Sequence, residues 1–210
     1  MEKEKKYIIL IVETLIITGM LCLAKFIPST GINGLDIVFN ISYNLIMGIT
    51  AFIACKLTGI KIDFEWKNYK QFIIGFGIAS LLALALGVIP AACGGSLAGP
   101  HQNFKIWNFL FNLFYLLLII GPVEEMVFRM YYQNTFISFF KKYKWIGIIV
   151  ASIIFGLFHI FNGWISVLIT FGIGLIFGFS KEYIKDIHYP GISFAHGLYD
   201  LFLRSITYIF

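Results

Sequence analysis

The sequence predicts an all-α integral membrane protein, a bundle of seven to eight transmembrane helices that enclose a polar intramembrane cavity. Hydrophobic residues make up 59% of its 210 positions and charged residues only 13%, against about 45–50% and about 25% in soluble domains. The mean hydropathy is +0.86. Such a chain cannot hide its apolar surface in one core, so lipid must cover part of it. We therefore expect a single membrane domain over residues 1–210.

Apolar runs of roughly spanning length predict the individual helices, because their length and lack of strict alternation exclude a barrel. A further run, Ile106–Ile120, continues into the more amphipathic Gly121–Phe140, and we expect Gly121-Pro122 to break it because proline cannot complete the helix ladder. We predict one net crossing for this segment, with a kinked or partly interfacial second half, and seven spans in all, with eight helices as the alternative. The other six runs are Tyr7–Ile27, Ile37–Leu57, Phe72–Ile89, Trp145–Phe161, Trp164–Phe179 and Ile192–Ile209.

Most lysines lie in short loops beside these runs, where positive charge marks the cytoplasmic side of a membrane protein. The twelve lysines of these loops all fall on one side of the membrane if Ile106–Phe140 crosses once. This arrangement predicts a multi-pass protein with a cytoplasmic N-terminus. The net charge of +5 is therefore a topology signal, and we expect no nucleic-acid partner. Richness in Ile, Phe, Lys and Asn favours a microbial cell membrane. The lysines concerned are Lys3, Lys5, Lys6, Lys56, Lys61, Lys67, Lys70, Lys141, Lys142, Lys144, Lys181 and Lys185.

One group of ionisable residues follows Gly121-Pro122 within an apolar segment. An ionisable group inside a span costs roughly 2.5–3.5 kcal/mol, so it marks either function or a specific pairing. In a helix Glu125 and Arg129 are four residues apart and can pair. Glu124 lies about 100° around the helix, so it stays available for chemistry.

Two further groups occupy later apolar runs. His159 lies at the end of an apolar stretch that is expected to be helical. His196 and Asp200 are four residues apart, so they share one face of a helix. Each group alone has a structural explanation, such as a hydrogen-bonded core histidine or a helix-packing contact. All of them in a chain with four histidines predict one shared polar site.

Three motifs in this order resemble the signature of the CAAX prenyl protease and bacteriocin-processing (CPBP, Abi) family of intramembrane peptidases. The resemblance covers roughly residues 104–202, and the preceding residues match only as generic spans. It implies an intramembrane endopeptidase that hydrolyses a peptide bond of a membrane-associated protein or peptide, with prenylated, CAAX-type substrates among the expected ones. The motifs are Glu124-Glu125-x-x-x-Arg129, Phe155-x-x-x-His159 and His196-x-x-x-Asp200.

The same resemblance implies a role for each motif. Glu124 would activate water with the help of His159, and His196 would stabilise the oxyanion. The pair Glu125 and Arg129 would support and position the site. Relatives that process prenylated proteins often carry asparagine at the position of Asp200. An ionised aspartate cannot donate to an oxyanion, so Asp200 could instead orient His196 or bind a metal.

Two chemistries stay open for these residues. Glu124, His159, His196 and Asp200 form a set of two histidines and two carboxylates that is chemically adequate for zinc, with an open position for water. The sequence contains no His-Glu-x-x-His helix, and metal-free catalysis by Glu124 is the other reading.

Two other functional classes are compatible with the motifs. A catalytically silent membrane scaffold or bacteriocin immunity factor would keep the resemblance without activity. A proton-coupled transporter would use buried Glu and His as a relay but predicts repeated halves, which are absent from the sequence. The expected partners are a protein or peptide substrate, lipidated ones included, and membrane lipids.

Overall fold

The computed structural model describes residues 2–26, 33–95 and 97–210, and its regular elements there are all helical, which confirms the all-α prediction. Ile27, the expected end of the first span, lies outside the described residues. The chain divides into two compact units, each built from segments distant in sequence. Unit 1 comprises Met1–Asp63 and Met126–Tyr183, and unit 2 comprises Phe64–Glu125 and Ile184–Phe210.

Unit 1 joins two N-terminal helices to the central part of the chain. Helix α1 packs on α2, α2 packs on the π-helical segment η3, and α8 packs on η3, α7 and α9. The elements are α1 (Glu2–Phe26), α2 (Asn33–Thr58), η3 (Met126–Gln133), α7 (Asn134–Phe140), the 3-10 turn η4 (Lys141–Tyr143), α8 (Lys144–Phe158), the 3-10 turn η5 (Ile160–Asn162) and α9 (Trp164–Tyr183).

The chain reverses between α7 and α8 at Lys141. The backbone φ of this residue is 38°, a positive value that residues other than glycine seldom adopt. Helix α8 then packs back along α7. At this crossing Gly147 faces the backbone of Ile137 so closely that a Cβ would lie 2.6 Å from its nitrogen. Helices α7 and α8 are therefore distinct elements, and their membership of separate membrane spans stays a prediction.

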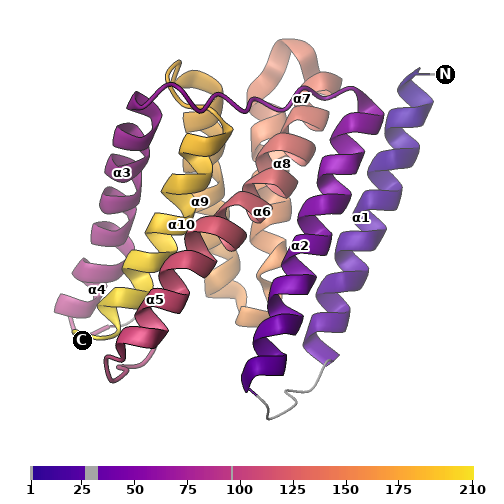
Figure 1. Ribbon diagram of the computed structural model, residues 1–210. Coiled ribbons are helices and arrows are strands. Elements are labelled where there is room, and N and C mark those ends of the chain that lie inside the picture. Colours follow the sequence, from indigo (N-terminus) through magenta and orange to yellow (C-terminus); the bar gives the residue numbers. More distant parts are fainter. Residues whose placement is uncertain (1, 27–32, 96) are drawn as a thin grey trace. The chain divides into compact units, whose positions relative to one another are not determined.

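Unit 2 is organised around α10, which packs against α3 on one side and against η2 and α6 on another. Figure 1 shows α3 and α10 side by side, and the rings of Phe72 and Phe194 meet edge to face with their centroids 5.6 Å apart. The elements are α3 (Lys70–Ala83), the π-helical η1 (Leu84–Val88), α4 (Ile89–Ala92), α5 (Ile106–Tyr115), the π-helical η2 (Leu116–Ile120), α6 (Gly121–Glu125) and α10 (Tyr189–Ile206).

The helix does not end at Gly121-Pro122, contrary to the expectation of a break. Pro122 has no N–H to offer the carbonyl of Leu118, so regular α-helical bonding cannot continue through it. The segment instead passes through π-helical turns before and after α6, where each N–H bonds to a carbonyl one residue further back. Helical structure therefore persists across the proline, and Glu124 and Glu125 lie in it directly after the proline.

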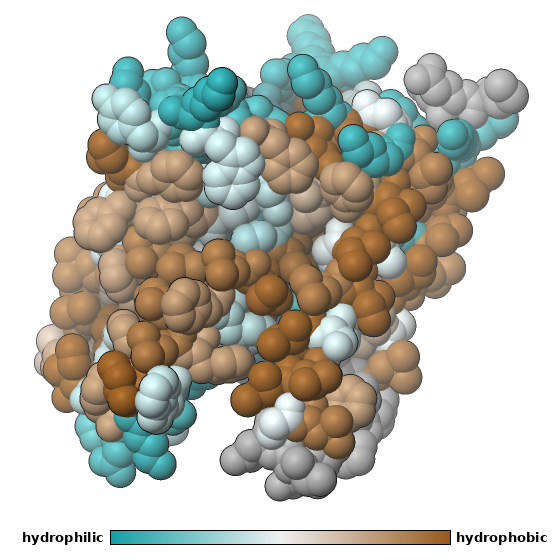
Figure 2. Space-filling view, in the orientation of Figure 1, coloured by the Kyte–Doolittle hydropathy of each residue, from teal (hydrophilic) through white to brown (hydrophobic). Residues whose placement is uncertain are grey.

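Four helical stretches of the described chain are long and apolar enough to cross a membrane, which indicates a multi-pass membrane protein. Large apolar side chains are exposed along the helices, and Figure 2 shows hydrophobic residues over most of the visible face with hydrophilic residues at the helix ends. The total of seven or eight spans and the polar cavity stay predictions. The four stretches are Gly34–Thr58, Lys70–Ala92, Ile106–Phe158 and Trp164–Tyr183.

Replacing Gly147 by alanine should lower stability, because the new methyl group would meet the backbone of Ile137. Overpacking of this kind costs about 1–3 kcal/mol. Gly172→Ala is the matched control, since Gly172 is also helical and a Cβ added there would meet no atom within 4 Å. The control should be neutral or gain up to about 1 kcal/mol from helix propensity. Thermal unfolding in detergent measures both, and equal unfolding midpoints would contradict the close packing of α7 and α8.

Candidate active site

Two glycines allow the helices that carry the acidic residues and His196 to cross at very short distance. A Cβ on Gly121 would collide with the carbonyl oxygen of Ser193, and a Cβ on Gly197 would collide with the carbonyl oxygen of Leu116. Glycine is the residue that permits such a close backbone approach. The crossing places Glu124 and Glu125 of unit 2 next to the middle of α10.

His196 and Glu125 form the shortest contact of the site. The His196 Nδ1 and Glu125 Oε1 atoms lie 2.7 Å apart, and the two side chains are 4% and 0% exposed. A carboxylate oxygen accepts, so Nδ1 carries the hydrogen and donates it. Hydrogen bonds to ionised groups are the strong ones in proteins. This contact fixes the orientation of the His196 ring and leaves the opposite nitrogen, Nε2, for other partners.

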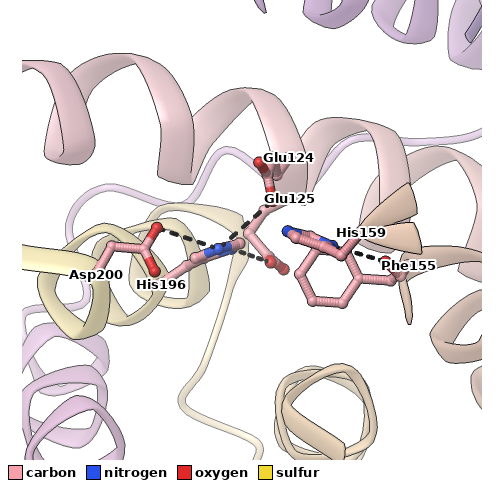
Figure 3. Close-up of polar contacts among 6 residues, drawn as sticks. All are labelled: Glu124, Glu125, Phe155, His159, His196 and Asp200. Atoms are coloured by element: carbon pink, nitrogen blue, oxygen red, sulfur yellow. Dashed lines mark hydrogen bonds and ion pairs between the residues drawn. The ribbon is translucent and has the colours of Figure 1, made fainter. Parts of the chain in front are cut away.

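The second nitrogen of His196 faces two more carboxylates. Glu124 Oε2 and Asp200 Oδ2 each lie 3.6 Å from Nε2, longer than a hydrogen bond but short enough for strong electrostatic interaction. Figure 3 shows the three carboxylates arranged around this one imidazole. The exposed side-chain fraction rises from 0% in Glu125 to 11% in Glu124 and 27% in Asp200, so the cluster is more open on the side of Nε2 than on the side of Glu125.

His159 lies in unit 1, at the end of α8. Its Nδ1 atom is 3.0 Å from the carbonyl oxygen of Phe155 (Figure 3). A carbonyl only accepts, so Nδ1 carries the hydrogen, and in a neutral ring Nε2 then presents a lone pair. The ring is held edge-on by Phe155 and Phe158, with centroids 5.1 and 5.7 Å away. His159 is therefore oriented as a base or as a ligand through Nε2.

Arg129 also lies in unit 1 and is fully buried. Its guanidinium carbon is 4.7 Å from the ring centre of Phe155 and 5.9 Å from that of Phe177. Aromatic faces attract a guanidinium group, and more strongly where water is excluded. The motif arginine is thus held by the same phenylalanine whose carbonyl orients His159. Its predicted pairing with Glu125 stays a prediction.

The structure brings Glu124, Glu125, His196 and Asp200 together within unit 2. His159 and Arg129 are placed with their own neighbours in unit 1, and their participation in one site with the other four stays a prediction. The roles expected for the six residues are likewise predictions. Glu124, Glu125 and His196 form a buried cluster, which is consistent with a catalytic site.

Two buried residues of the same unit were not singled out by the sequence. The Tyr189 hydroxyl donates to the carbonyl of Pro122 at 2.8 Å, and the Gln71 Oε1 atom accepts from the Gly191 N–H at 2.9 Å. Both contacts involve the first turn of α10. The Pro190 after Tyr189 is a helix-start signal, but no spacing in the sequence indicates partners 67 and 120 positions away.

Zinc is not accommodated by the observed side-chain positions. Throughout the part of the chain that the structure describes, no group of three or more His, Cys, Asp or Glu side chains could hold a metal ion. The His196 Nδ1 atom is engaged by Glu125, and the carboxylates on the other side lie 3.6 Å from Nε2. A zinc site would require these side chains to move, so it stays an alternative to be tested by experiment.

Comparison with known protein families gives a match to part of the chain. Residues 106–202 match the family model Rce1-like, described as "Type II CAAX prenyl endopeptidase Rce1-like". Neither a curated protein nor a solved structure matches the chain. The matched segment runs from α5 into α10 and includes all three motifs.

The geometry predicts different costs for losing the two carboxylates that lie on opposite sides of His196. Glu125→Ala removes the acceptor of a fully buried hydrogen bond and should lower the free energy of unfolding by about 3–5 kcal/mol. Asp200→Ala removes a partly exposed group 3.6 Å away and should cost less than about 1 kcal/mol. Thermal unfolding in the same detergent measures both variants. A larger loss in Asp200→Ala would contradict the assignment of Glu125 as the partner that orients His196.

Proposed function

Since residues 106–202 belong to the Rce1-like family of CAAX proteases, we propose that the chain is an intramembrane endopeptidase. Its reaction is hydrolysis of a peptide bond in a membrane-associated protein or peptide. One observation carries the proposal beyond the family match: His196 is buried among three carboxylates where two helices cross. Charged groups so placed in a membrane protein are costly and usually functional.

In the proposed reaction Glu124 is the base. Its carboxylate takes a proton from water as the water oxygen bonds to the carbonyl carbon of the substrate. The Nε2 lone pair of His159 accepts a hydrogen bond from the same water and orients it. The carbon–nitrogen bond then breaks, and Glu124 returns the proton to the leaving amine. The products are a carboxylic acid and an amine, which become a carboxylate and an ammonium group when the acid proton passes to the amine.

His196 is the proposed donor to the oxyanion. Its Nδ1 hydrogen is directed to Glu125, so donation from Nε2 requires a second hydrogen and hence an imidazolium ring. Such a charge is complemented by Glu124 and Asp200, which flank Nε2. In this proposal Asp200 stabilises the positive charge of the His196 ring and keeps the ring oriented, and it does not itself contact the oxyanion.

We infer seven crossings, with a cytoplasmic N-terminus. Two features support the number of crossings. The segment from Ile106 to Phe140 is continuously helical, so it counts as one crossing, and the chain reverses after it at Lys141. Support for the orientation comes from lysines near the start or end of neighbouring helices in each unit, with Lys105 at the start of α5 an exception. In unit 1 the Lys144 ammonium pairs with Glu182 at 2.7 Å where α8 begins and α9 ends. In unit 2 Lys70 and Lys185 lie near the starts of α3 and α10.

The proposed orientation implies a position of the cluster relative to the cytoplasmic end of α10. His196 lies in the third turn of α10, well after its start at Tyr189, and at 1.5 Å per residue this corresponds to about 10 Å along the helix. The substrate would therefore enter from the cytoplasmic side and bring its scissile bond a short way into the membrane. A lipidated substrate of the CAAX type suits this location, because its lipid can stay in the bilayer while the peptide reaches the cluster.

Cleavage should stop when the proposed chemical groups are removed. Glu124→Gln, His159→Ala and His196→Ala should each reduce product formation by about 100-fold or more, because each removes the base, its helper or the oxyanion donor. Comparative peptidomics of membranes that contain the wild type or a variant measures the products. Glu182→Gln, the same chemical change at a surface ion pair, is the control and should keep full activity.

The same comparison separates an enzyme from a silent scaffold or immunity factor. Substrate-derived peptides that disappear in Glu124→Gln but persist in Glu182→Gln support the peptidase. If all three site variants yield the same peptides as the wild type at equal protein levels, the peptidase proposal is wrong. A scaffold would also keep its biological effect in the Glu124→Gln variant.

Metal dependence is tested separately, by exhaustive chelation followed by addition of zinc. The metal-free reaction proposed for Glu124 should proceed unchanged after chelation, as measured by the same product peptides. Activity lost on chelation and restored only by zinc would replace the metal-free reading with the zinc alternative. The Glu124→Gln variant, which stays inactive under every condition if Glu124 is the base, is measured in parallel.

A further inference from the structure

A tyrosine hydroxyl connects the two helices that carry the cluster. Tyr189 is the first residue of α10 and is buried, and its hydroxyl donates to the carbonyl of Pro122 at 2.8 Å. Pro122 precedes Glu124 by two residues in α6. The bond therefore runs from the helix of His196 and Asp200 to the helix turn of the glutamate pair.

The first turn of α10 is also held from the other side. The Gln71 side chain of α3 is fully buried, accepts from the Gly191 N–H at 2.9 Å, and donates to the carbonyl of Glu65. The N–H groups of a first helical turn have no partner within the helix, so this contact satisfies one of them. With α10 fixed against α3 by Gln71, the Tyr189 bond sets its position against α6.

Packing alone does not require the Tyr189 hydroxyl. The ring lies edge-on to Phe64, with centroids 5.1 Å apart, and a phenylalanine would fill the same space. The hydroxyl adds the bond to Pro122. A bond that joins two halves of a reactive cluster affects geometry more than stability, and small misplacements of reacting groups cost large factors in rate.

We propose that Tyr189 is a positioning residue that sets the distance and direction of Glu124 and Glu125 relative to His196. It touches neither substrate nor the reacting atoms and acts through the carbonyl of Pro122. Its effect on cleavage rests on the proposed peptidase function, whereas its effect on the His196 ring does not.

The test is Tyr189→Phe, with Tyr208→Phe as the matched control. Tyr208 lies beyond the end of α10 in the same unit, with its ring against Phe104. The chain has four histidines, so ¹⁵N-histidine labelling gives few signals, and those of His196 are assigned with His196→Ala. Tyr189→Phe should shift the ring-nitrogen signals of His196 and leave those of His101 unchanged, while the thermal midpoint stays within a few degrees of the wild type.

Product formation, measured by membrane peptidomics, should fall by roughly 10- to 100-fold in Tyr189→Phe and stay unchanged in Tyr208→Phe. Unchanged His196 signals together with unchanged product formation would overturn the proposal, as would equal effects of the two variants. If the wild type forms no product, the peptidase function falls, and the His196 signals alone decide whether Tyr189 positions the cluster. A shift then still supports the positioning role, and no shift refutes it.

Discussion

The close crossing of α10 with the segment η2–α6 is the constraint on which the cluster depends. Gly121 and Gly197 face the backbone of the opposite helix with no room for a methyl group. With larger residues the axes would separate, and the contact between His196 and Glu125 at 2.7 Å could not form. Two residues without side chains therefore determine where four ionisable side chains meet.

The sequence predicted the helical fold well because run length and composition report directly on lipid exposure. It also predicted separate helices on either side of Lys141–Lys144. The prediction of a break at Pro122 was wrong. Proline lacks the N–H that one α-helical hydrogen bond needs, but π-helical turns before and after α6 let the helix continue, and the sequence does not indicate such turns. The pairing of α10 with α3 could not be predicted either, since it depends on contacts such as that of Gln71 with Gly191 across 120 positions.

The sequence named the four ionisable residues that meet in unit 2 but not their contacts between helices, and the site as a whole stays a prediction. Spacing indicated that His196 and Asp200 share a helix face, and Asp200 does lie with Glu124 beside the Nε2 atom of His196. Spacing gave no sign that Glu125 bonds to His196 or that Arg129 lies over the ring of Phe155. Periodicity describes neighbours on one helix, whereas these contacts join segments distant in sequence, where only the packing geometry decides which groups meet.

The three carboxylates around His196 differ in exposure, from fully buried Glu125 to Asp200, whose side chain is 27% exposed. The carboxylates on the two sides of His196 should therefore differ in their accessibility to reagents. A carboxyl-directed reagent should modify Asp200 before Glu124 and leave Glu125 untouched. A small inhibitor would likewise meet Asp200 first, so a cationic head group suits this side of the cluster. The difference in exposure among the three carboxylates thus indicates which side of the cluster a selective ligand would reach.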